Sequence, residues 1–104
     1  MNPIRDGPAD LTFADCAVVV PAARVLVTMT DDGHGALRIS PGTVPNMTEI
    51  ETALESGPFT LTSDAGMLTC RPLHWVVREL TDSVCELLLL FEADCADLEH
   101  TRAP

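Results

Sequence analysis

The residues that could do acid–base chemistry gather in one short segment. Asp31, Asp32 and His34 lie in the sequence DDGHG, where two carboxylates and an imidazole are near enough to exchange a proton. The same segment has the aspartates and glycines of a tight turn between strands, and a solvated turn is the simpler interpretation. The chain contains no glycine-rich phosphate loop, nucleophile elbow or HExxH motif. We therefore expect no catalytic residue, no cofactor and no enzymatic activity.

Four soft side chains could be imagined as zinc ligands, in the pairs Cys70-x3-His74 and Cys95-x4-His100. Neither spacing is that of a known zinc finger or ribbon. If the segment that begins at Pro72 is one helix, Cys70 and Cys95 lie at opposite ends of an element about 36 Å long. They could then share a metal only if the helix were broken. We expect no metal site, and reduced, mostly buried thiols at all four cysteine positions.

Composition indicates a single small domain, residues 1–104, with a loose segment at 1–10 and a frayed tail at 96–104. The formal net charge is −10, which disfavours direct binding to nucleic acid or to an anionic membrane and favours a basic partner. The chain shows no secretory signal, and no apolar run approaches the roughly 18 residues of a membrane span. We expect a cytoplasmic protein.

Alternating apolar residues and turn sequences predict an α+β fold, in which an antiparallel sheet of about five strands packs against two helices. A capping sequence at Asn46 and the glycine at Gly57 bound the first helix. A weak internal repeat supports the order strand, hairpin, helix, hairpin, helix. The expected strands are Ala17–Val20, Arg24–Thr30, Ala36–Ser40, Phe59–Ser63 and Met67–Arg71, and the expected helices are Met47–Ser56 and Pro72–Cys95.

The segment Pro72–Cys95 holds the only tryptophan, a run of four leucines and a phenylalanine. Its apolar residues recur three or four positions apart, which is helical spacing. Thr81, Asp82 and Ser83 are weak helix formers, and a hairpin that turns at these residues stays open as an alternative. Leu89 and Leu90 do not fit a single apolar stripe, so this element is either buried on several sides or presents a surface to a partner.

In order of elements, small size and acidity, the chain resembles the class I effector chaperones of bacterial type III secretion systems, the Tir-chaperone-like group. The resemblance covers roughly residues 11–98. It rests on RVLVTMTDDGHGALRIS, which is similar to the early strands of the family, on FTLTSDAGMLTCRPL, which is similar to its next hairpin, and on the acidic, leucine-rich C-terminal segment. The family usually opens with an amphipathic helix of several turns, whereas only about ten residues precede Leu11 here.

The resemblance implies a homodimeric chaperone that binds the N-terminal segment of a secreted effector in extended form, without chemistry. In the family the middle helix commonly contributes to the dimer, which points here to Ile50 and Leu54. The effector would contact apolar positions on strands and helices. The residues chosen for this role are Trp75, Leu89, Leu90, Phe59 and Leu61.

Two other interpretations remain open. The chain could be an acidic inhibitor, such as a phage-type anti-defence protein that mimics nucleic acid and blocks a basic surface of its target. Such a mimic should lose binding steeply with salt, whereas a chaperone that binds through apolar area should tolerate it. The other interpretation is a metal-binding or enzymatic domain built on the cysteine–histidine pairs.

Overall fold

The computed structural model describes residues 6–13, 18–30 and 32–93. Within these ranges the chain forms eight strands, one α-helix and one short 3-10 helix. In chain order they are β1 (Asp6–Pro8), β2 (Asp10–Phe13), β3 (Val19–Val20), η1 (Ala22–Arg24), β4 (Val25–Met29), β5 (His34–Thr43), α1 (Val44–Ser56), β6 (Phe59–Ser63), β7 (Gly66–Glu79) and β8 (Val84–Ala93).

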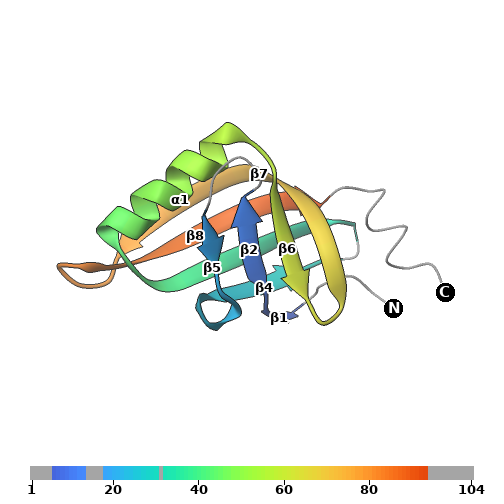
Figure 1. The fold of residues 1–104 in the computed structure, drawn as a ribbon, viewed down its shortest axis with the longest axis horizontal. Helices are drawn as coiled ribbons and strands as arrows, with labels where there is room; N and C mark the ends of the chain where they lie inside the picture. The colour runs from blue at the N-terminus through green and yellow to red at the C-terminus, as the bar shows by residue number, and fades with distance from the viewer. Residues whose placement is uncertain (1–5, 14–17, 31, 94–104) are drawn as a thin grey trace.

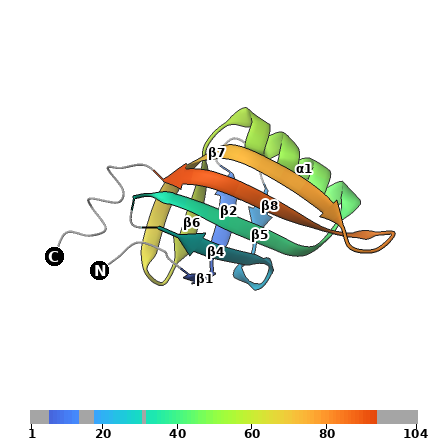
Figure 2. The same ribbon diagram turned by 180° about the vertical axis from the view of Figure 1, so that it is seen from behind.

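All eight strands belong to one antiparallel sheet, in the order β1-β4-β5-β8-β7-β6-β2-β3. The sheet curls, so that β6 and β2 cross in front of β4, β5 and β8 (Figure 1). The helix α1 packs beside them against β8 and β5. Seen from behind, no described element covers β4, β5, β8 and β7 (Figure 2). The molecule therefore has an enclosed inner face and an open outer face.

The curl depends on the long strand β7, which changes neighbour along its length. Residues 66–70 pair with β6, and residues 70–79 pair with β8. A bulge between Pro72 and His74 follows directly after this change, and a second bulge lies between Ile39 and Gly42 of β5. Because a bulge bends the strand and increases its twist, these two irregularities turn the ends of the sheet toward each other.

The core lies between the two curled halves and is closed by α1. Its strands present every second residue inward, as Val25, Val27 and Met29 of β4 do. Phe59 lies at the junction of the two halves, with its ring centroid 5.8 Å from that of Phe91 and 6.0 Å from that of Phe13. These edge-on and tilted contacts join strands from opposite ends of the chain, so the core forms only when the sheet has curled.

The prediction of five strands and two helices is wrong, and the largest error concerns Pro72–Cys95. This segment forms the end of β7, a turn and β8. The turn is held by the Val84 carbonyl oxygen, which accepts hydrogen bonds from the amides of Leu80 and Thr81 at 2.8 and 3.1 Å. The hairpin that turns at Thr81–Ser83 is therefore the correct alternative. Exposed leucines on the outer face fill the gaps in the strand alternation and so imitate helical spacing.

The middle of the chain follows its sequence pattern closely. The strand Phe59–Ser63 is confirmed as β6, and the predicted helix is α1, followed by Gly57 at a φ of 143°. The helix begins at Val44 with Thr43 as its N-cap, so Asn46 lies inside it. Cys95, His100 and the tail at 96–104 lie outside the described residues, as does Asp31. None of the described helices is long and apolar enough to cross a membrane.

Candidate functional site

The residues expected to contact an effector are distributed over two faces of the sheet. Leu90 is 52% exposed and points outward from β8. Leu89, Phe59 and Leu61 are buried in the core, at 1% exposure or less. Trp75 is partly buried against the core, and its indole N–H donates a hydrogen bond of 3.2 Å to Glu51 of α1. Of these five residues, only Leu90 stands on the open outer face.

The residues expected at a dimer contact, Ile50 and Leu54, lie on the inner side of α1. They are 4% and 2% exposed, and both belong to the hydrophobic core. Their apolar surface already packs inside the protomer. The middle helix offers a different surface to solvent, on which Glu49 and Glu55 are exposed.

The outer face of the sheet carries a group of exposed apolar side chains that we call the outer patch: Leu26, Val76, Leu88 and Leu90. Their exposures lie between 40% and 52%. The strand register places three of them in one row. Leu88 of β8 pairs with Val76 of β7 on one side and with Arg38 of β5 on the other, and Arg38 pairs with Leu26 of β4. Leu90 follows two residues after Leu88 on the same face. Figure 2 views the molecule from this open side.

Two ion pairs flank the outer patch along β7 and β8. Arg71 Nη2 lies 3.0 Å from Glu92 Oε2 at one end, and Arg78 binds Glu86 at the other. Glu86 is the only buried charged residue in the described part of the chain, at 4% exposure. Arg38 lies between these pairs and makes no ion pair with any described residue. The outer face thus carries apolar side chains with Arg38 among them and an ion pair at either end.

The second half of β7 provides a free strand edge. Residues 71–79 pair with β8 on one side, and no described strand pairs with them on the other. In Figure 2 this edge runs along the upper margin of the sheet, beside α1. An open groove of about 480 Å³ lies next to it, lined by Leu54, Glu55, Gly57, Pro58, Arg71, Pro72 and Trp75. The edge and the groove together could receive a strand and one of its side chains.

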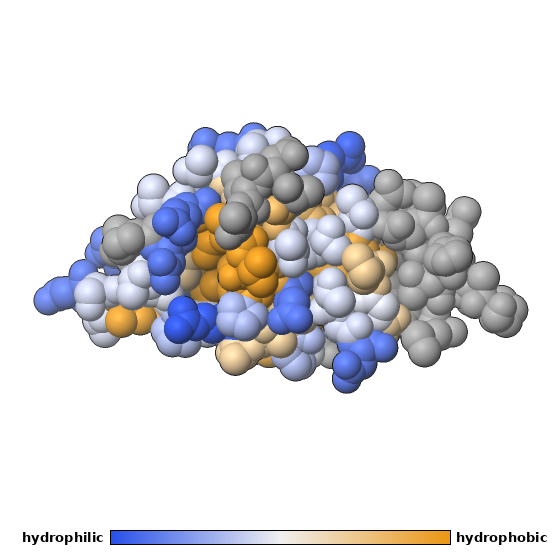
Figure 3. Space-filling model, viewed as in Figure 1, coloured by the Kyte–Doolittle hydropathy of each residue, from blue (hydrophilic) through white to orange (hydrophobic). Residues whose placement is uncertain are grey.

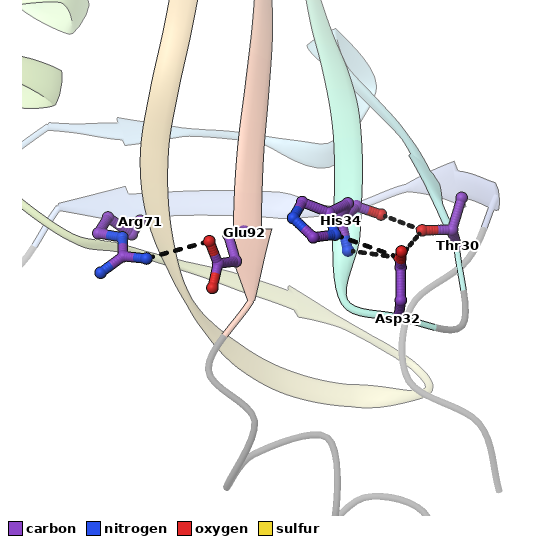
Figure 4. A network of polar contacts seen from close by, with 5 residues as sticks. All are labelled: Thr30, Asp32, His34, Arg71 and Glu92. Atoms are coloured by element: carbon purple, nitrogen blue, oxygen red, sulfur yellow. Dashed lines mark hydrogen bonds and ion pairs between the residues drawn. The ribbon is translucent and has the colours of Figure 1, made fainter.

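Hydrogen bonds join Thr30, Asp32 and His34 between β4 and β5 (Figure 4). The Thr30 hydroxyl donates to the Asp32 carboxylate, and the His34 amide donates to the same oxygen at 3.2 Å. These bonds, that of Thr30 first, lower the pKa of Asp32 from 3.8 to about 2. An aspartate held ionised in this way is a poor general acid or base near neutral pH, so the geometry favours a structural turn.

The cysteine and histidine pairs predicted as a zinc alternative are not brought together where the structure describes them. Cys70 is buried in the core, whereas His74 is exposed and pairs with outward-facing Leu90. Within residues 6–13, 18–30 and 32–93, no group of three or more His, Cys, Asp or Glu is arranged to hold a metal. Cys70 and Cys85 are both buried, at 1% exposure.

A second hollow lies between β3, β5 and the first half of α1. Its volume is about 200 Å³, and Val20, Ile39, Met47 and Ile50 supply apolar walls. Figure 3 shows apolar side chains gathered near the middle of the face that carries α1. Since these four side chains are buried, we interpret the hollow as a shallow opening of the hydrophobic core and not as a separate binding site.

Comparison of the chain with models of known protein families, with curated proteins and with solved structures finds no match. A function can therefore be argued only from the surfaces described above: the outer patch, the β7 edge with its groove, and the exposed side of α1. Sequence reasoning missed Leu26, Val76 and Leu88 because it assigned residues 72–95 to a helix. Once residues 84–93 are assigned to a strand, its period of two puts Leu87, Leu89 and Phe91 on one face and Leu88 and Leu90 on the other.

Proposed function

We propose that this protein is a non-enzymatic binding domain that takes up an extended segment of a partner protein along the free edge of β7. The unpaired edge of residues 71–79 is the observation that carries the proposal. A chaperone that holds the N-terminal segment of a secreted effector would need such a surface. The resemblance to type III secretion chaperones suggests that role, although a hairpin replaces the C-terminal helix it implied.

A free strand edge binds through its backbone, because unpaired amides and carbonyls accept an added antiparallel or parallel strand. The bulge between Pro72 and His74 interrupts this edge, so the regular part is residues 75–79. Proline has no amide hydrogen, which further restricts pairing near Pro72. The proposed site therefore accepts a short stretch of about five residues.

The groove beside the edge would supply selectivity. Trp75, Leu54 and Pro72 give it apolar walls, and Glu55 lies at its border. In strand addition, backbone hydrogen bonds contribute affinity while pockets choose alternate side chains. A partner segment with an apolar residue and a nearby basic residue fits this combination. The net charge of −10 also favours a basic segment at a distance.

Hydrogen exchange can test the proposal with a defined probe. The probe is a soluble peptide that alternates valine with threonine and ends in two arginines. Its matched control has proline at every second position and cannot pair along a strand edge. We expect the first peptide, but not the second, to slow exchange of the amides of residues 75–79. Slowed exchange confined to α1, or the same effect from both peptides, would overturn the proposal.

Filling the groove should block the probe without loss of the fold. Glu55 is exposed on α1, and Glu55→Trp places a large ring at the border of the groove. Thr48→Trp is the control, because position 48 lies on the same side of the helix, two turns earlier. We expect Glu55→Trp alone to weaken peptide binding, by about tenfold or more, in a fluorescence anisotropy titration. Equal affinity of the two variants would exclude the groove.

A second candidate function is the acidic inhibitor that mimics nucleic acid, and the surface of α1 favours it. The helix contains Glu49, Glu51 and Glu55 and no lysine or arginine. Its target would be a basic protein surface, and binding would fall by orders of magnitude with salt. Peptide capture at β7, by contrast, should weaken only modestly with salt, because backbone hydrogen bonds and the apolar groove contribute most of the affinity. For either function we propose a cytoplasmic location, in keeping with the free thiol of Cys85.

A further inference from the structure

We infer that the outer patch is a dimer interface, through which the outer face of the sheet binds the same face of a second copy of this chain. The inference concerns side chains on the outer face and does not depend on peptide capture at the β7 edge. It replaces Ile50 and Leu54, which are buried within the protomer, as the expected dimer contact.

The first argument is the arrangement of the apolar side chains. Val76, Leu88 and Leu90 stand on neighbouring strands and point the same way, so they adjoin one another. Leu26 points to the same face and lies beyond Arg38 in the row of Leu88. Ala36, which pairs with Leu90, extends the patch. Single exposed apolar residues need no explanation, but a continuous group framed by polar residues is typical of a protein–protein contact.

The second argument is area. Four half-exposed side chains, with Ala36 and the methylene stems of the surrounding arginines, offer on the order of 450 Å² of apolar surface. A stable interface buries about 800 Å² on each partner, of which about 56–65% is apolar. The outer patch therefore supplies about the apolar share that one side of such an interface requires, and its polar border supplies the remainder.

The third argument is charge, because the outer face is less acidic than the rest of the surface and is therefore where two copies of the chain can meet. Two chains of net charge −10 repel one another, and a dimer must form where acidic residues are fewest. By strand register the outer face has Arg38, Arg71 and Arg78 against Asp6, Glu86 and Glu92, a formal balance of zero on a chain of net charge −10. This face thus holds three of the six arginines in the chain. The acidic surface of α1 lies on the other side of the sheet and would point away from the partner (Figure 1).

A two-fold axis through the outer face would also give Arg38 a partner. Arg38 makes no ion pair with a described residue of its own chain, and it lies in the same row as Leu88 and Val76. Glu92, whose side chain is 35% exposed, borders the same face. In an isologous contact, Arg38 of each copy can approach a carboxylate of the other. The interface then combines apolar contacts with charge pairs made by Arg38 and the carboxylates that border the face.

Sedimentation equilibrium of the full chain tests the inference. We expect a mass of twice 11.2 kDa, with a dissociation constant that falls as salt is raised to about 0.5 M, since salt screens the repulsion between acidic chains. The double variant Leu88→Ser, Leu90→Ser removes four leucines from the dimer and should raise the dissociation constant at least about 100-fold. Arg38→Glu should also weaken the dimer, whereas Arg38→Lys should retain it.

The control is Met67→Ser, because Met67 is 64% exposed on a part of β7 that pairs with β6, outside the outer patch. This variant should leave the dissociation constant unchanged. Circular dichroism of each variant establishes that it is folded. A wild-type protein that stays monomeric at hundreds of micromolar would overturn the inference, and so would a dimer that the double variant leaves intact. Peptide protection of residues 75–79 is measured separately, so failure of one proposal is distinguishable from failure of the other.

Discussion

Three consecutive leucines of β8, truncated one at a time, test the strand assignment most directly. Leu89 is 1% exposed and lies on the inner face between Leu37 of β5 and Trp75 of β7. Its neighbours Leu88 and Leu90 are 40% and 52% exposed on the outer face. Leu89→Ala should therefore be far more destabilising than the same change one residue before or after it.

The magnitude follows from burial. Removing a fully buried leucine side chain costs about 3 kcal/mol, through lost transfer energy and the cavity that remains. A half-exposed leucine loses about half of the transfer energy and leaves no cavity, so Leu88→Ala and Leu90→Ala should each cost about 1 kcal/mol or less. For a domain of this size, 3 kcal/mol lowers Tm by more than about 10 °C.

Urea denaturation of the three variants, followed by circular dichroism at several protein concentrations, provides the measurement. A contribution from association would make the midpoint concentration-dependent, so it can be separated from the stability of the protomer. A helix at residues 72–95 would place Leu87 and Leu88 in the core and Leu89 outside it. The strand assignment would therefore be refuted if Leu88→Ala proved as costly as Leu89→Ala.

Two further predictions concern β5 and the turn before it. Gly35→Ala should destabilise by about 1–3 kcal/mol, because its methyl group would lie 2.6 Å from the Phe91 ring and 2.9 Å from a backbone oxygen. Gly42→Ala meets only the flexible end of a methionine and should cost less in the same urea measurement. In an NMR titration, the pKa of Asp32 should be about 2, so its stabilising effect is present above pH 3.8 and lost toward pH 2; Thr30→Val should raise that pKa.

The parts of the fold that the sequence predicts well are those whose partners are close along the chain. The hairpin that contains DDGHG and the hairpin that starts at Phe59 each pair residues across a short turn. The helix α1 has its own apolar face and a glycine at its end. In all three, local turn chemistry and side-chain period agree, and no distant contact is needed to choose between alternatives.

The parts that the sequence does not predict depend on distant contacts. Strand β2 has four residues and is fixed by pairing with β6, where Leu11 lies opposite Leu61, fifty positions later. Such a short segment carries too little periodicity to identify itself. The error at residues 72–95 has a different cause. In β8 the sequence does not alternate between apolar and polar residues, because the exposed positions of the outer face are also leucines.

That error also explains why the predicted contact residues were only partly on the surface. A shift of one residue in a strand moves a side chain to the other face of the sheet. The sequence interpretation included Leu89 and Leu90, but in β8 the exposed pair is Leu88 and Leu90. The outer patch becomes visible only when β7, β8, β5 and β4 are placed side by side, which brings Val76, Leu88 and Leu26 into one row.

Binding through the outer face, the β7 edge and the surface of α1 should depend on salt in three different ways. A salt titration can therefore distinguish the three hypotheses. Contact between two outer faces should strengthen as salt screens the charge of −10 on each chain. Capture of a strand at β7 relies mainly on backbone hydrogen bonds and an apolar groove, so its affinity for a basic segment should fall only modestly. Binding through the glutamates of α1 should weaken steeply. The proposed contact between outer faces leaves the β7 edge and the helix α1 uncovered, so either partner-binding function would be compatible with the proposed dimer.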